Sequence, residues 1–119
     1  MTPELARYLE EALGRLRAAL DLEALYLFGS HARGTADRRS DLDLLVVART
    51  SLPPLERIGL VLELLKDAPL PVEALVLTPE ELQERRDLPF LQGVLGRRNP
   101  FMSAEKRLLE DRRVRLGKG

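Results

Sequence analysis

Apolar residues near the start of the chain repeat at helical spacing. Thr2 offers a hydroxyl N-cap and Pro3 stands at the first helical position, which together mark a helix start. The apolar side chains that follow predict one amphipathic helix over residues 3–20. They are Leu5, Tyr8, Leu9, Leu13, Leu16 and Leu20.

Three short apolar segments predict strands. Residues 24–28 contain two aromatic side chains and stop at a glycine, residues 41–48 alternate at first and are then wholly apolar, and residues 72–77 are apolar apart from one glutamate. Such lengths and compositions are typical of buried strands. The polar loop between the first two, residues 29–40, is short for a parallel crossover yet long for a hairpin. The strand directions therefore stay open at this level.

Proline-led segments predict two more helices. Pro53 and Pro54 open a helix that runs to about Asp67, and Thr78-Pro79-Glu80-Glu81 begins a shorter one over residues 79–86. Periodicity weakens beyond Leu88, although residues 103–115 could form another helix. The longer helix is expected to bury the face that carries Leu55, Ile58, Leu62 and Leu65. Helices that alternate with short strands predict an α+β fold, a small sheet covered by helices.

Length and composition narrow the class of protein. A chain of 119 residues suits one compact domain, and the lack of cysteine excludes disulfides, thiolate zinc sites and cysteine nucleophiles. No uncharged stretch exceeds nine residues, whereas a membrane helix needs about 20 apolar residues. The N-terminus lacks the layout of a signal peptide, so a cytoplasmic location is expected. Residues 97–119 hold 8 basic and 3 acidic side chains, which predicts a basic, partly helical extension that is either solvated or bound to an acidic partner or RNA.

Two carboxylates, Asp41 and Asp43, flank Leu42 at the start of the second predicted strand. Residues two apart in a strand point to the same face, roughly 6.5–7 Å apart. Such carboxylates repel each other unless a divalent cation lies between them, and two Mg²⁺ ions about 3.5–4 Å apart are the arrangement used for nucleotidyl transfer. Oxygen ligands without cysteine favour Mg²⁺ or Mn²⁺ over zinc. Taken alone, the pair would equally fit a turn residue followed by an exposed strand residue.

A Gly-Ser pair precedes these aspartates, where the first predicted strand ends. Gly29 lets the backbone approach a ligand closely, and the Ser30 hydroxyl with the free amides of a following helical turn is suited to an anion. Arg33 lies about one turn further along and could reach the same phosphates. His31 either contacts a phosphate, assists proton transfer or is simply solvated.

The combined pattern resembles the signature of the nucleotidyltransferases related to DNA polymerase β, in which Gly-Ser and Asp-x-Asp are separated by ten residues, as they are here. The fuller segment, residues 29–44, is similar to the minimal nucleotidyltransferases of bacteria and archaea. The resemblance implies the polymerase β palm-like nucleotidyltransferase fold over residues 1–96. It also implies that Gly29 and Ser30 hold the nucleotide phosphates and that the two aspartates bind catalytic metal ions.

The family uses a third acidic residue on the following strand, where Glu73 is the candidate here. With Asp41 and Asp43 it would complete the implied catalytic and metal-binding set. The usual residue at this position is aspartate, and the extra methylene of glutamate could shift the carboxylate by about 1 Å. An edge position that faces water is the alternative interpretation of Glu73.

The resemblance implies Mg²⁺-dependent transfer of a nucleoside monophosphate, AMP from ATP, to a hydroxyl group. Minimal nucleotidyltransferases commonly form the antitoxin half of a two-gene module. The implied partner is therefore a HEPN-type ribonuclease toxin, and the implied acceptor is one of its tyrosines. Two alternatives stay open: a binding subunit that neutralises its partner by occlusion, and a homodimeric enzyme that modifies a small molecule. Neither membrane binding nor direct nucleic-acid binding is expected.

Overall fold

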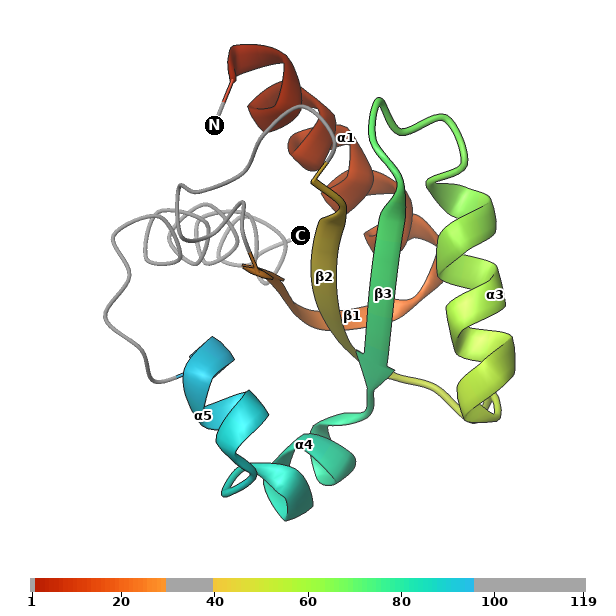
Figure 1. The fold of residues 1–119 in the computed structure, drawn as a ribbon. Coiled ribbons are helices and arrows are strands. Elements are labelled where there is room, and N and C mark those ends of the chain that lie inside the picture. Colours follow the sequence, from red (N-terminus) through yellow and green to blue (C-terminus); the bar gives the residue numbers. More distant parts are fainter. Residues whose placement is uncertain (1, 30–39, 96–119) are drawn as a thin grey trace, which may run out of the picture.

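The computed structural model describes residues 2–29 and 40–95. The elements in chain order are α1 (Pro3–Ala19), β1 (Asp21–Phe28), β2 (Leu42–Arg49), α3 (Pro54–Leu64), β3 (Val72–Leu77), α4 (Pro79–Arg85) and α5 (Pro89–Leu95). This order confirms the α+β class and the predicted alternation of helices and strands (Figure 1). Helix α5 was not predicted, because the apolar periodicity is weak there. The basic extension over residues 97–119 lies outside the described residues.

The three strands form one sheet in the order β1-β2-β3 (Figure 1). β1 runs antiparallel to β2, and β2 runs parallel to β3. The sheet is therefore mixed, and α3 supplies the crossover connection that a parallel pair needs. The pairing decides the strand directions that the apolar pattern left open.

The central strand β2 is the most deeply buried element. Leu42 and residues 44–48 have no exposed surface, so both faces of the strand are covered over most of its length. Helices α1 and α3 pack on one face, and α5 packs on the other, where Phe90 contacts Phe28. Asp43 is only partly buried and is thus the one position within this buried run that opens to solvent.

Two helix starts carry the caps that the sequence predicts. In α1 the Leu5 amide donates to Thr2 Oγ1 at 3.1 Å. In α4 the Glu81 amide donates to Thr78 Oγ1 at 3.2 Å while the Thr78 amide donates to Glu81 Oε1 at 3.0 Å, which forms a capping box. Local hydrogen bonds therefore define where both helices begin.

The predicted buried face of α3 is confirmed only in part, because Leu65 is buried and Ile58 packs against the core but the other two leucines do not. Leu55 is 82% exposed and Leu62 is 38% exposed, whereas Val61 is fully buried. The helix is rotated because Arg57 points inward, where its guanidinium donates to the Leu52 carbonyl oxygen at 2.7 Å. A hydrophobic pattern cannot identify a core position that is occupied by an arginine. The helix also ends at Leu64, earlier than the predicted end near residue 67.

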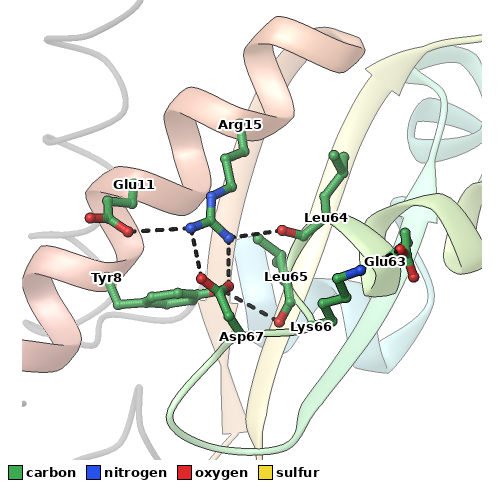
Figure 2. A network of polar contacts seen from close by, with 8 residues as sticks. All are labelled: Tyr8, Glu11, Arg15, Glu63, Leu64, Leu65, Lys66 and Asp67. Atoms are coloured by element: carbon green, nitrogen blue, oxygen red, sulfur yellow. Dashed lines mark hydrogen bonds and ion pairs between the residues drawn. The ribbon is translucent and has the colours of Figure 1, made fainter.

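A polar network joins α1 to the end of α3 (Figure 2). The Arg15 guanidinium donates to both carboxylate oxygens of Asp67, at 2.5 and 2.9 Å, and to the Leu64 carbonyl oxygen at 2.9 Å. The Tyr8 hydroxyl donates to the same carboxylate at 3.0 Å. Burial, together with the hydrogen bond to Asp67, raises the pKa of Tyr8 to about 12, and the hydrogen bond from Arg15 lowers the pKa of Asp67 to about 2. Arg15 and Asp67 therefore stay charged at neutral pH, and their hydrogen bonds connect α1 to the end of α3.

Within the described ranges, no helix combines the length and the apolar character needed to cross a bilayer.

Candidate active site

Asp43 lies near the beginning of β2, at the centre of the sheet. In the ladders it is paired with Phe28 of β1 on one side and with Glu73 of β3 on the other. Paired residues in neighbouring strands project to the same face, so all three side chains share one face of the sheet. Leu42 and Leu44 are fully buried on the opposite face. The alternation expected from the sequence is confirmed here, and it leaves a carboxylate on a strand that is otherwise apolar as far as Ala48.

Gly29 lies against the Asp43 carboxylate. Its φ is +72°, a conformation that side chains rarely adopt, and a Cβ placed on it would lie only 2.1 Å from Asp43 Oδ2. Only glycine fits both the backbone conformation and the space. The structure therefore brings the predicted glycine and the second predicted aspartate together, at the point where β1 ends.

The remaining residues of the predicted loop are not described. Ser30, His31 and Arg33 lie outside the described residues, so their roles at the nucleotide phosphates stay predictions. Asp41 directly precedes β2 and is partly exposed. It thus stands two residues before Asp43, at the same end of the strand.

Glu73 is exposed and lies on β3, at the edge of the sheet. It is paired with Asp43 in the parallel ladder, so the two acidic residues are neighbours on adjacent strands. Among residues 2–29 and 40–95, however, no three His, Cys, Asp or Glu side chains come close enough together to hold a metal ion. The third ligand thus stays a prediction, and Glu73 has the water-facing edge position of the alternative interpretation.

The carboxylate oxygens at this site are nevertheless suitable ligands for Mg²⁺. This ion prefers oxygen ligands and is usually bound by one or two carboxylates together with substrate phosphates, not by a complete cage of protein ligands. Asp43 and Asp41 offer two such carboxylates at one end of β2, and Gly29 lets the backbone lie directly against one of them. These residues would hold the metal, with the nucleotide supplying further oxygens.

Replacing Gly29 by alanine is expected to damage both the fold and the site. The methyl group would clash with Asp43 Oδ2. The alanine backbone would also have to keep a positive φ, which costs roughly 1–2 kcal/mol. A carboxylate displaced by about 1 Å is expected to lower the transfer rate on the order of 100-fold. Thermal unfolding and nucleotidyl-transfer rates measure the two effects.

Gly14 provides the matched control, because no atom lies within 4 Å of a Cβ built there. Gly14→Ala is expected to retain activity and to gain stability, since alanine favours the helix by about 1 kcal/mol. Full transfer activity in Gly29→Ala would contradict the close approach described above.

One residue beside the site was not predicted as part of it. The segment after Leu88 has only weak apolar periodicity, but Phe90 of α5 lies against Phe28, and Phe28 is paired with Asp43. The signal that could have found Phe90 is its aromatic side chain on a short proline-led segment. Its proximity depends on the tertiary packing of α5.

A small mixed sheet in which a glycine lies against a strand aspartate agrees with the nucleotidyltransferase fold that the motif implies. The family model described as "Nucleotidyltransferase domain" matches residues 7–96, and the chain belongs to this family. The chain is also 35% identical over 82 residues to the "Putative protein adenylyltransferase MJ1305" of Methanocaldococcus jannaschii. That alignment covers 63% of this chain and 54% of the relative, so the chain spans about half of the relative's length.

Proposed function

We propose that this nucleotidyltransferase is a Mg²⁺-dependent protein adenylyltransferase that moves AMP from ATP to a hydroxyl group of a partner protein. One observation carries the proposal: Gly29 has a positive φ and lies against the carboxylate of Asp43. This contact joins the phosphate-binding end of the predicted motif to its metal-binding end. The printed name of the archaeal relative supports a protein as the acceptor.

The reaction needs few protein groups. The acceptor oxygen attacks the α-phosphorus of ATP, a new phosphorus–oxygen bond forms, and the bond to the oxygen that bridges to the β-phosphorus breaks, so pyrophosphate leaves. Bound Mg²⁺ supplies neutralisation of the phosphate charge. Asp41 and Asp43 would hold the metal, and the backbone at Gly29 would lie beside the phosphates. Glu73 lies on the same face as Asp43. It would accept the proton of the acceptor hydroxyl or serve as a third carboxylate ligand of the metal ion.

The acceptor that we propose is a tyrosine hydroxyl of a HEPN-type ribonuclease toxin, which would make this protein an antitoxin. The support is the similarity of residues 29–44 to minimal nucleotidyltransferases, which commonly occur with such toxins. Ser30 and Arg33 would position the phosphates in this reaction. The neighbouring reading frame in the genome is the natural source of the partner for a test.

Glu73→Gln is expected to reduce AMP transfer by about 100-fold or more, because the amide can no longer accept a proton. Binding of ATP is expected to persist, since Asp41 and Asp43 remain. The purified protein, the product of the neighbouring reading frame, ATP and Mg²⁺ are incubated together, and the intact mass of the neighbour is measured. Glu84→Gln, an exposed acidic residue on α4, is the matched control and should transfer AMP at the wild-type rate. An unmodified neighbour with the wild-type enzyme would contradict the proposal.

A second candidate function is neutralisation of the partner by occlusion. It is favoured by the exposure of Glu73 and by the finding that no three acidic side chains converge among the described residues. Partner inhibition that survives Glu73→Gln and needs no ATP would support this candidate. Inhibition that requires ATP and fails in the variant would support adenylylation.

A further inference from the structure

Two phenylalanines meet at the edge of the candidate active site. The chain contains three phenylalanines, and the rings of Phe28 and Phe90 pack edge to face with centroids 5.1 Å apart and an angle of 87° between the ring planes. Phe28 is paired with Asp43 across the antiparallel ladder and directly precedes Gly29. The aromatic pair therefore lies on the same face of the sheet as the carboxylate.

Phe90 is much more exposed than the buried apolar residues of α5. Leu91 and Val94 are 2% and 3% exposed and belong to the core, whereas Phe90 is 47% exposed. The contact with Phe28 holds one part of the ring in place, and nearly half of the residue's surface remains open to solvent. Removing this apolar surface from water would be favourable, so the ring can contribute to binding a flat apolar group.

We propose that Phe90 binds the base of the nucleoside triphosphate and that the site therefore prefers purine nucleotides. The inference rests on the proposed function, because it requires a nucleotide whose phosphates lie at Gly29 and Asp43. The ribose and base must then extend away from the phosphates, and in the described part of the chain Phe28 lies beside Asp43 on that face with Phe90 packed against it. A base stacked on an aromatic ring binds about 5- to 150-fold more tightly than one without it. Purines offer the larger stacking surface.

The experiment compares ligands that contain a base with one that lacks it. Binding of Mg²⁺ complexes of ATP, CTP and inorganic triphosphate is measured by calorimetry for the wild-type chain and for Phe90→Ala. The variant is expected to bind ATP about 5- to 150-fold more weakly and to bind triphosphate as the wild type does. The preference of the wild type for ATP over CTP is expected to shrink in the variant.

Two further variants serve as controls. Phe90→Tyr keeps a ring of the same shape and is expected to restore ATP binding. Leu55→Ala removes an exposed apolar side chain, 82% exposed, from α3 on the other face of the sheet and should leave both affinities unchanged.

The outcomes separate this inference from the proposed function. If the wild type binds both ATP and triphosphate, and Phe90→Ala binds ATP equally well, the base-binding role of Phe90 is refuted while the proposed function stands. An equal loss of ATP and triphosphate binding in the variant also refutes it, because the residue then supports the phosphate site or the fold. A wild-type chain that binds neither ligand in the presence of Mg²⁺ refutes the proposed function and this inference with it.

Discussion

Asp43→Asn is expected to lower the rate of AMP transfer at least about 100-fold, the loss typical of removing one preorganised electrostatic group from an active site. Asparagine has nearly the same shape as aspartate, so the tight approach of Gly29 at this position is retained. What is lost is the negative charge that would hold Mg²⁺ on the sheet face. The expected defect is therefore one of metal-dependent chemistry and binding, with a similar unfolding temperature.

Calorimetric titration of ATP with and without Mg²⁺ measures this effect directly. In Asp43→Asn, addition of Mg²⁺ should no longer increase the affinity for ATP, and Asp41→Asn should show the same defect. Asp87→Asn is a suitable control, because Asp87 is exposed and lies after α4, away from the beginning of β2. Wild-type Mg²⁺-dependent binding in both variants would eliminate the two aspartates as metal ligands.

Arg57→Met is expected to reduce the free energy of unfolding by about 3 kcal/mol, near the lower end of the range for breaking a buried ion pair. Arg57 is only 6% exposed. Its guanidinium donates to Glu81 Oε1 at 2.7 Å and also to the carbonyl oxygens of Leu52 and Val76, at 2.7 and 3.5 Å. Methionine fills part of the space but leaves these acceptors without their donor. Urea denaturation followed by circular dichroism measures the loss.

The exposed pair of Lys66 and Glu63 provides the matched control, with side chains 72% and 68% exposed. Lys66→Met should change stability by less than about 1 kcal/mol, because solvent screens such pairs. A similar loss of unfolding free energy in Arg57→Met and Lys66→Met would show that the buried pair stabilises the fold no more than the exposed pair does.

The same pair predicts a dependence of stability on pH. The hydrogen bonds from Arg57 and from the Thr78 amide lower the pKa of Glu81. A carboxylate with a lowered pKa stabilises the folded state above its unfolded pKa, about 4.3. That contribution is lost as the pH falls through the lower pKa of the folded state. In Arg57→Met, stability should therefore decline less steeply below about pH 4.3 than in the wild type.

Much of the secondary structure was predictable because its signals are local. The hydroxyl-proline starts of α1 and α4 form the expected caps, and the strand over residues 72–77 has the predicted bounds. The inward face of α3 was predicted only in part, because Arg57 occupies a core position by pairing with Glu81, a residue 24 positions away. Helix α5 was missed because its amphipathic signal is short.

The sequence by itself determined which residues are candidates for the chemistry, because the spacing of Gly29 from Asp41 and Asp43 identifies a nucleotidyltransferase motif. Strand alternation then predicts that the aspartates lie on one face of the strand and that Leu42 and Leu44 lie on the other. Tertiary structure alone decided that β1 is antiparallel and β3 parallel to β2, and thereby that Asp43 is paired with Phe28 and with Glu73. The physical reason is that local spacing specifies only the face of a strand on which a side chain lies, whereas register depends on contacts between distant segments.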